Sequence, residues 1–414
     1  MLMPIRPLPL APSPVPLQAE TGVTAARGFH ASGLHCGVRR NRSDLALIVS
    51  DRPASAAAVF TTNLVKAAPV LVSQAHLLAS GGMARGIVIN AGNANACTGE
   101  HGMQAARAMA AETARLLGVP DCEVLVSSTG VIGEKLPVER ILAALPRAAG
   151  SLSSGGGLDA ANAILTTDTC TKQAVRTVIT AQGCSYTMGG VAKGSGMIHP
   201  NMATTLGFVT TDAAIAPAML QASLRRATER SFNRITVDGD TSTNDMVGIL
   251  ANGASGAVID DAELPAFEAA LTDLLTDLAR QVARDGEGAT RLVTIDVTGA
   301  KCEEDAVQVA KTIATSPLVK TAIYGRDANW GRIIAAAGRS GVHVVAERMS
   351  ITANGLSLLQ PDLNASFSEE EALKRLSQDE VTLTIDLGLG DCSATVWTCD
   401  LTPGYVTINA AYRS

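Results

Sequence analysis

The sequence predicts an α/β (α+β) protein. Short runs rich in β-branched residues alternate with longer runs whose apolar residues recur every three or four positions. The hydrophobic fraction of 47% and the mean hydropathy of +0.21 exclude a disordered chain. Only 3% of the residues are aromatic, so we expect a large aliphatic core. A chain of 414 residues suits two or three domains, or one large duplicated α/β body.

Individual elements follow from local patterns. Strands are predicted where a run is short, β-branched and bounded by Gly, Asn, Asp or Ser, at residues 45–50, 86–90, 123–128, 292–299 and 381–388. Amphipathic helices are predicted at residues 101–118, 216–231, 263–286 and 302–317. Gly- and Ser-rich segments at 150–157 and 252–256 are loops or a domain seam, and we expect the seam near residue 150.

The amino-terminal segment is rich in proline. Prolines recur every few positions in residues 1–20, and they would break the helix of a signal peptide. We therefore expect a flexible N-terminal arm in this segment.

Charge and cysteine content exclude several classes of protein. The net charge of -6 comes without a basic patch, so no nucleic-acid partner is expected. No run approaches the ~18 apolar residues that a membrane span needs. The eight cysteines form no C-x-x-C pair, and His30 and His35 do not share a helix face, so no metal site is predicted. Scattered thiols favour a cytoplasmic location.

Two further motifs carry no function by themselves. The run VDGDTSTND (237–245) crowds three aspartates, but Thr243 and Ile249 stand where a calcium loop of the EF-hand type needs Gly and Glu. We interpret it as a turn whose Asp and Asn side chains cap backbone N–H groups. The runs KGSGMI and DLGLGD lack the third glycine of a dinucleotide loop.

A glycine-rich segment near the middle of the chain raises a chemical question. In AKGSGMIHPNMATTLGF (192–208), cleavage before Thr204 would give this residue a free α-amino group beside its own hydroxyl. Such an amine has a pKa of about 7.7 to 8.0 and can serve as general base near neutral pH. Small Ala203 leaves the scissile carbonyl open to attack by the hydroxyl. The alternative is a Gly-rich connector that leads into an ordinary strand.

The same segment resembles the self-cleavage motif of a known family. KGSGMIHPNMATTL is similar to that of the ornithine acetyltransferase family, the ArgJ-type glutamate N-acetyltransferases of arginine biosynthesis. Eight other segments resemble the family in the same order, so the resemblance covers nearly the whole chain after residue 20: 57–70, 90–99, 127–137, 166–169, 231–246, 285–291, 325–333 and 408–414.

The resemblance implies a fold and a processing step. The implied fold is a four-layer α/β/β/α sandwich of the DmpA/ArgJ-like type. The implied cut lies between Ala203 and Thr204 and gives an α chain, residues 21–203 after the arm, and a β chain, residues 204–414. Two such αβ pairs are expected to form an α2β2 heterotetramer.

The resemblance also implies a set of site residues. Thr204 matches the nucleophile, which accepts acetyl from N2-acetylornithine and passes it to L-glutamate. Thr129 and Gly130 match the oxyanion-hole pair, whose donors are worth ~3 to 4 kcal/mol each in other acyl-transfer enzymes. The matching substrate-binding residues are Thr166, Lys193, Thr204, Glu287, Asn409 and Ser414.

Substrate chemistry agrees with two of these matches. The α-carboxylate of both amino acids needs a cation such as Lys193, and the δ-ammonium of ornithine needs an acid such as Glu287. His199 stands five residues before the nucleophile and is left out of the site, because an N-terminal threonine needs no triad base.

No cofactor is expected, because the acyl-enzyme holds the acetyl group between the two steps. Bifunctional members of the family also accept acetyl-CoA, which is therefore an alternative donor here. Two other interpretations remain open at this point: a self-processing amidohydrolase or aminopeptidase of the same fold, and a protein that keeps the fold but is never cleaved.

Overall fold

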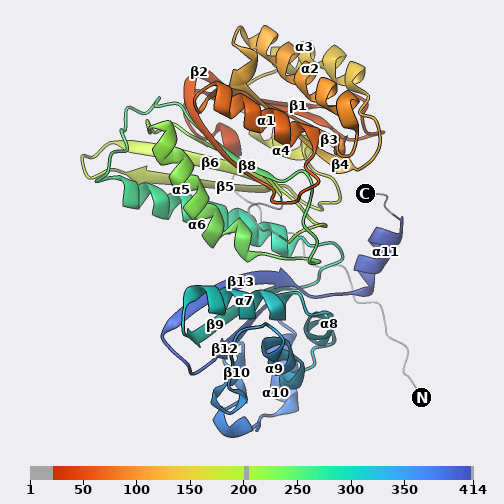
Figure 1. The fold of residues 1–414 in the computed structure, drawn as a ribbon, viewed down its shortest axis with the longest axis vertical. Coiled ribbons are helices and arrows are strands. Elements are labelled where there is room, and N and C mark those ends of the chain that lie inside the picture. Colours follow the sequence, from red (N-terminus) through yellow and green to blue (C-terminus); the bar gives the residue numbers. More distant parts are fainter. Residues whose placement is uncertain (1–21, 200–204, 412–414) are drawn as a thin grey trace.

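The computed structural model describes residues 22–199 and 205–411, which form two β-sheets, one of eight strands and one of five (Figure 1). The strands of the first sheet are β1 (Phe29–Leu34), β2 (Leu45–Phe60), β3 (Met83–Asn93), β4 (Val124–Val131), β5 (Lys172–Ile179), β6 (Ser185–Lys193), β7 (Leu206–Thr211) and β8 (Met246–Ala251). The helices packed on it are α1 (Ala68–Ala79), α2 (Gly99–Leu117), α3 (Val138–Gly150), α4 (Gly157–Ala163), α5 (Pro217–Arg230) and α6 (Leu264–Arg284).

The long strand β2 joins the two halves of this first sheet. Its residues 45–50 pair with β1 and β3, and its residues 55–60 pair with β8. Because side chains alternate along a strand, Leu45 and Leu47 lie in the core under α1–α3, whereas Ala46 and Ile48 lie in a different core on the other face. Each half of the sheet is therefore covered on both faces.

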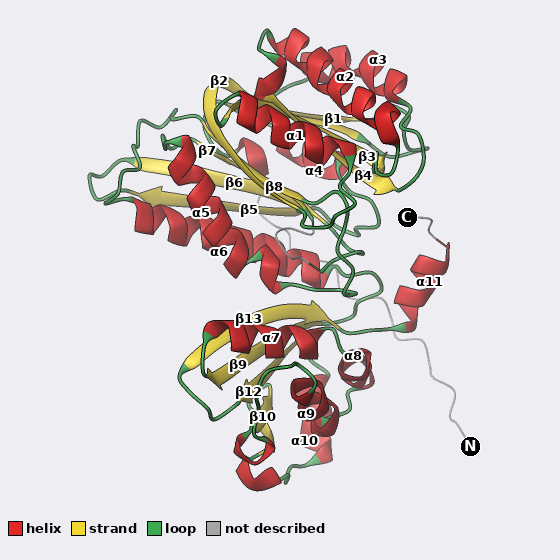
Figure 2. Cartoon of the chain, in the orientation of Figure 1, coloured by secondary structure: helices red, strands yellow, loops and turns green. Residues whose placement is uncertain are grey.

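The first sheet and its helices form four layers, with an apolar core between each pair of neighbouring layers. Helices α1–α3 cover the outer face of β2–β4, and α5 and α6 cover the outer face of β5–β8. The inner faces of the two halves share a third core, in which Ile87 of β3 and Phe208 of β7 both take part together with α4. Figure 2 shows α2 and α3 on one side of the strands of the first sheet and α6 on the other. The four-layer α/β/β/α sandwich is confirmed for this part of the chain.

The second sheet follows the first along the chain and has the strand order β11-β10-β12-β9-β13. Its strands are β9 (Leu292–Ala300), β10 (Ser350–Ala353), β11 (Leu356–Leu359), β12 (Glu380–Asp386) and β13 (Cys392–Cys399). Its apolar face is packed by α7 (Glu303–Ala314), α8 (Pro317–Gly325), α9 (Trp330–Gly338) and α10 (Glu369–Leu376). The last helix, α11 (Pro403–Ala411), has no buried residue and projects from the side of the molecule (Figure 1).

A buried lysine connects the two sheets. Lys320 of α8 is 4% exposed, and its Nζ donates to the carbonyl oxygen of Val237 at 2.7 Å and to Thr398 Oγ1 of β13 at 2.9 Å. Val237 opens the aspartate-rich loop 237–245. The second sheet is thereby linked to a loop that belongs to the first.

The predicted elements are confirmed, and one predicted boundary is wrong. All five predicted strands and all four predicted helices are present, although β2 continues ten residues beyond its predicted end, to Phe60. The expected seam near residue 150 is only the loop between α3 and α4, and residues 252–256 are likewise a loop; the change of sheet falls between α6 and β9. Gly and Ser clusters mark turns, which occur inside domains as well as between them.

The predicted cut can be located in this fold, whereas the predicted N-terminal arm cannot. Residues 1–20 lie outside the described residues. The predicted cleavage position lies between β6 and β7, which are antiparallel neighbours in the first sheet, with Lys193 opposite Leu206. The two predicted chains would therefore share one sheet. No helix in residues 22–199 or 205–411 combines the length and the apolar character that crossing a membrane requires.

Candidate active site

One pocket of about 190 Å³ lies where the ends of several strands meet. The end of β4, the end of β6 and the residues just before β7 and β8 all contribute to its wall, together with α11. The pocket brings together the predicted site residues that the structure describes, although they are up to 280 positions apart (409 - 129 = 280): Thr129, Gly130, Thr166, Lys193, Glu287 and Asn409.

Three predicted site residues lie outside the described residues: Ala203, Thr204 and Ser414. The neighbouring Thr205 is described, is buried and lines the pocket. Its hydroxyl donates to the carbonyl oxygen of Lys193, and its own carbonyl oxygen accepts from the N–H of Met246 at 3.1 Å. The second residue after the predicted cut is therefore held by both neighbouring strands, β6 and β8.

Gly130 ends β4 in a conformation that few other residues adopt. Its φ is 131°, and a Cβ atom there would press against the backbone of Gly92 and Asn93. The preceding Thr129 is 9% exposed, and its Oγ1 accepts from Lys193 Nζ at 3.3 Å. The predicted oxyanion pair thus lies on the pocket wall beside the predicted binding lysine.

Lys193 is a buried cation that faces this wall. It is 7% exposed, and its Nζ lies 4.0 Å from Asp168 Oδ2. Burial lowers the pKa of Lys193, whereas the carboxylate of Asp168 acts in the opposite direction. An amine in this environment gains from any further anion that enters the pocket, such as a substrate carboxylate.

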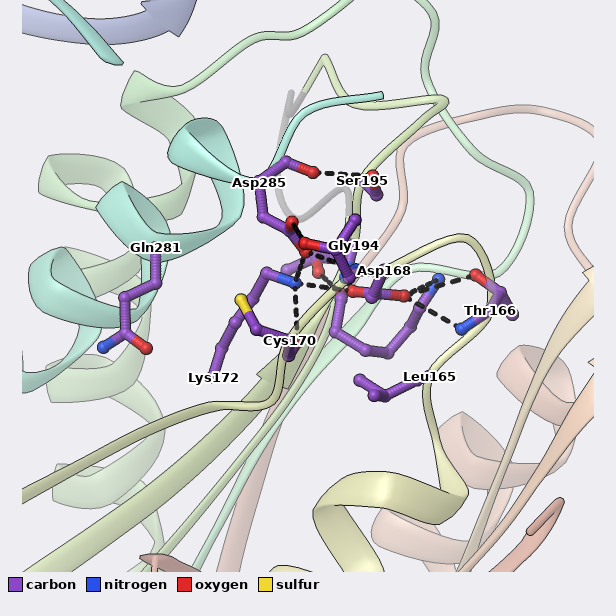
Figure 3. A network of polar contacts seen from close by, with 12 residues as sticks. Leu165, Thr166, Asp168, Cys170, Lys172, Gly194, Ser195, Gln281 and Asp285 are labelled. Carbon is purple, nitrogen blue, oxygen red and sulfur yellow. Dashed lines mark hydrogen bonds and ion pairs between the residues drawn. The ribbon is translucent and has the colours of Figure 1, made fainter. Parts of the chain in front are cut away.

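A network of buried charges surrounds Asp168, the ion-pair partner of Lys193 (Figure 3). Lys172 is fully buried, and its Nζ donates to Asp168 Oδ1 at 2.8 Å and to Asp285 Oδ2 at 2.6 Å. Burial disfavours the charge on Asp168, yet Lys193 and Lys172 hold its pKa below the ordinary value. Asp168 therefore stays ionised, and the two carboxylates raise the pKa of Lys172, which stays protonated.

The same network fixes the backbone of two pocket segments. Asp168 accepts from the N–H of Thr166 at 2.9 Å and from the N–H of Gly194 at 2.7 Å. The carbonyl oxygen of Asp285 accepts from the hydroxyl of Ser195 at 2.6 Å. Asp168 thereby connects a predicted substrate residue to the loop that follows Lys193.

Sequence reasoning did not place these supporting residues in the site. Asp168 and Asp285 lie inside two of the segments that resemble the family, so the signal was present but pointed to no role. Nothing in the sequence distinguishes Lys172 from a surface lysine.

Glu287 and Asn409 form the opposite part of the wall. Asn409 Nδ2 donates to Glu287 Oε2 at 2.7 Å, and Glu287 is 6% exposed. A Cβ atom on Gly196 would meet the carboxylate of Glu287, which would then have to shift. Because Asn409 stands on α11, this contact joins the end of the chain to the pocket.

The aspartate-rich loop 237–245 also lines the pocket. Asp238 accepts from the N–H groups of Met197 at 2.6 Å and Ile198 at 2.9 Å, which confirms the interpretation as a capping turn. Met197 has a positive φ of 55°, so this cap holds a strained position. The loop contributes two further acids to the wall, Asp240 and Asp245, which the sequence interpretation left out of the site.

His199 does not line the pocket. Its Nδ1 forms a hydrogen bond with Thr236 Oγ1 at 3.1 Å, and burial lowers its pKa. No cluster of three or more His, Cys, Asp or Glu side chains suited to a metal ion occurs in residues 22–199 and 205–411.

Comparison with known proteins gives one consistent result. The sequence profile of the ArgJ family matches residues 30–414. The arginine biosynthesis bifunctional protein ArgJ of Chlorobaculum tepidum is 52% identical over 399 residues, which cover 96% of this chain and 98% of that protein. Its counterpart of the same name in Bacillus subtilis is 47% identical over 395 residues, 95% of this chain and 96% of that protein.

Solved structures include similar chains. The crystal structure of the arginine biosynthesis bifunctional protein ArgJ from Bacillus halodurans is 47% identical and covers 50% of this chain and 98% of its own, with a TM-score of 0.48. An ornithine acetyltransferase from Mycobacterium tuberculosis, solved with ornithine, is 41% identical and covers 45% of this chain and 98% of its own, with a TM-score of 0.42.

Proposed function

The chain belongs to the ArgJ family, and on that premise we propose that it is a glutamate N-acetyltransferase of arginine biosynthesis. It moves acetyl from N2-acetylornithine to L-glutamate. The observation that carries this proposal is that one pocket gathers the six described residues that the family resemblance selected from distant parts of the chain.

The proposed nucleophile is Thr204, freed by self-cleavage after Ala203. Attack of the Thr204 hydroxyl on the Ala203 carbonyl gives an ester, which water opens into chains of 203 and 211 residues (414 - 203 = 211). The new α-amino group then deprotonates the hydroxyl for attack on the substrate amide. The position of Thr205 on the pocket wall supports this proposal, because it is the next residue along the chain.

Thr129 and Gly130 are the proposed oxyanion hole for both reactions. Gly130 has no Cβ, which leaves its backbone able to lie close to Gly92 and Asn93 at the end of β3. Donors that are already fixed in position need no reorganisation when the tetrahedral oxyanion forms, which is the source of their effect.

Charge decides how the substrates are proposed to lie. Lys193 binds the α-carboxylate, and Glu287 binds the δ-ammonium of acetylornithine. Thr166, Asn409 and Ser414 complete the substrate contacts. The buried pair of Lys193 and Asp168 supports this arrangement, since it holds a cation in place before the substrate arrives.

The remaining parts of the proposal concern partners and location. No cofactor takes part, and acetyl-CoA is an alternative acetyl donor. The chains from one precursor form an αβ pair, and two pairs form an α2β2 heterotetramer. A cytoplasmic location is favoured by the eight cysteines, all of which are free thiols.

The decisive experiment measures the products. Purified protein incubated with acetylornithine and glutamate should form acetylglutamate and ornithine in equal amounts. Free acetate instead of acetylglutamate would favour an amidohydrolase. Thr204→Ala should abolish both the cut and turnover, and an active wild-type protein that migrates as one uncut band contradicts the proposal.

A further inference from the structure

Asp245 is a pocket residue to which the mechanism above gives no role. It immediately precedes β8, whose first residue, Met246, pairs with Leu206 at the start of β7. Its side chain lines the pocket, yet the residue is only 3% exposed. Among the described residues, its Oδ2 has no hydrogen-bond partner. A buried carboxyl oxygen without a partner is costly, so one that lines a pocket points to a ligand.

The groups around Asp245 do not offset the cost of burying its negative charge. A hydrogen bond from Ser242 and the charge of Lys193 both act to lower the pKa of this carboxyl. Lys193 itself faces Asp168 and Glu287 as well, with Lys172 behind. Burial raises the pKa of Asp245 well above the ordinary value, against the smaller effects of Ser242 and Lys193. The carboxyl therefore keeps a proton at a pH at which an exposed aspartate has lost it.

The proposed reaction needs such a group at its centre. The amine of ornithine becomes a free ammonium ion on release, whereas glutamate arrives as an ammonium ion and must attack as a neutral amine. Each cycle therefore gives one proton to the departing amine and takes one from the arriving amine. The α-amino group of Thr204 already serves as the base for its own hydroxyl, so a second group is needed for this proton.

We propose that Asp245 is the catalytic residue that exchanges a proton with the amino group of the two substrates. This inference rests on the proposed function. Its free Oδ2 is the atom that contacts the amine. A side-chain contact supports this position: Nδ2 of the neighbouring Asn244 donates to the carbonyl oxygen of Ser128 at 2.9 Å, which ties the residues before β8 to β4, the strand that carries Thr129 and Gly130.

The protons balance over one cycle. When the C–N bond of acetylornithine breaks, the hydroxyl proton of Thr204 reaches the nitrogen through the α-amine, and ornithine leaves as a neutral amine. The protonated carboxyl of Asp245 gives its proton to that amine, which departs as ammonium. The carboxylate then takes one proton from the ammonium of glutamate. The neutral amine attacks the acetyl ester, and its second proton returns through the α-amine to the oxygen of Thr204.

The test isolates deprotonation of the acceptor amine by comparing an acceptor that needs a base with one that does not. The acetyl-enzyme of Asp245→Asn is formed by incubation with acetylornithine, freed of ornithine, and mixed with either glutamate or hydroxylamine at pH 7. Hydroxylamine is already mostly neutral at that pH and needs no base. Loss of a general base costs ~10² to 10⁴ in rate. We expect a loss of at least about 100-fold with glutamate and the wild-type rate with hydroxylamine.

A matched control is Asp261→Asn, which makes the same change at an exposed acid outside the pocket and should leave both rates unchanged. At a pH that neutralises the amine of glutamate, the Asp245→Asn rate should approach that of the wild type. Because Oδ2 has no partner to lose, the variant should also melt at or above the wild-type temperature.

Each contrary result overturns the inference. Equal losses with glutamate and hydroxylamine would show a structural role, and no loss with either would show none. A folded Asp245→Asn protein that fails to cut itself would assign the carboxyl to maturation instead. Wild-type protein that releases no ornithine from acetylornithine contradicts the proposed function itself, and this inference with it.

Discussion

At the scale of residues, the shape of the pocket depends on two glycines, which have no Cβ atom. Gly130 and Gly196 each stand where a Cβ atom would collide, in one case with the backbone of Gly92 and Asn93 and in the other with Glu287. Such positions are recognisable in a sequence only as glycines. The atoms that a Cβ would meet at either glycine lie at least 37 positions away along the chain (130 - 93 = 37).

Gly130→Ala tests the oxyanion hole. The new Cβ must displace the end of β4, because its neighbours are backbone atoms that cannot rotate away. We expect turnover to fall by about 10² to 10³, the cost of one misplaced oxyanion donor. Gly133→Ala is the control, since it also has a positive φ of 83° but open space around it. Equal turnover in the two variants, measured as acetylglutamate formed, would contradict the assignment.

Lys172→Met tests the buried network. It leaves Asp168 and Asp285 buried without their cation, which should lower the free energy of unfolding by about 3 to 5 kcal/mol at pH 7. Urea unfolding of the single-chain Thr204→Ala background measures it. Arg176→Met, at the half-exposed ion pair with Asp273, should cost about 0 to 1 kcal/mol. A Lys172 variant as stable as the Arg176 variant would refute the role of the network.

The pH dependence of that loss has a defined sign. The pKa of Asp168 is lowered in the folded state, so its contribution is present above the ordinary carboxyl pKa of about 3.9 and is lost as the pH falls further. The pKa of Lys172 is raised, so its contribution is complete below about 10.4. The difference between Lys172→Met and its background should therefore be constant between about pH 5 and pH 9 and shrink towards pH 3.

At the scale of elements, a strong hydrophobic pattern was sufficient to predict a strand or helix, and a weak one was not. The runs 45–50 and 263–286 predicted β2 and α6 because their apolar spacing is regular and long. Strands β6 and β7 were not predicted, since glycines and threonines give them little hydrophobic contrast, and they are strands because neighbours pair on both sides. Local propensity is overruled there by tertiary pairing.

The sequence likewise identified some residues of the candidate site and missed others. The resemblance selected the residues that are proposed to contact the substrate, and the described ones line one pocket. It did not select Asp168, Lys172 or Asp245, whose importance comes from burial and from partners far along the chain. Burial of a charged residue is a property of the packed molecule and has no signature in a single sequence.

Helix α11 gives a test at this scale. It has no buried residue, and Asn409 joins it to the pocket through Glu287. Removal of residues 403–414 should therefore leave the melting temperature and the cut unchanged, because little apolar area is lost. It should raise the KM for acetylornithine strongly. A truncated protein that unfolds, or one with an unchanged KM, would contradict a role limited to substrate binding.

At the scale of the whole molecule, the predicted cut divides the chain but not the fold. It lies between β6 and β7, which pair from Met188 opposite Thr211 to Lys193 opposite Leu206. The apolar core under α5 and α6 contains residues from both sides of the cut. Cleavage therefore removes one covalent bond and leaves the burial that stabilises the structure intact.

This organisation predicts that the two chains stay together. Mature protein should elute as a single species in native size-exclusion chromatography and separate into two bands of nearly equal size on a denaturing gel. Separation of the chains under native conditions would show that the sheet does not hold them. The uncut Thr204→Ala variant, which should elute at the same volume, is the control.

One measurement tests the central claim most directly: the intact masses of the denatured protein after incubation with acetylornithine and no acceptor. The account predicts a chain of residues 1–203 and a chain that begins Thr-Thr-Leu-Gly, the second heavier by one acetyl group on its first residue, with glutamate removing that group. A single uncut chain, or an acetyl group on any other residue, would contradict it.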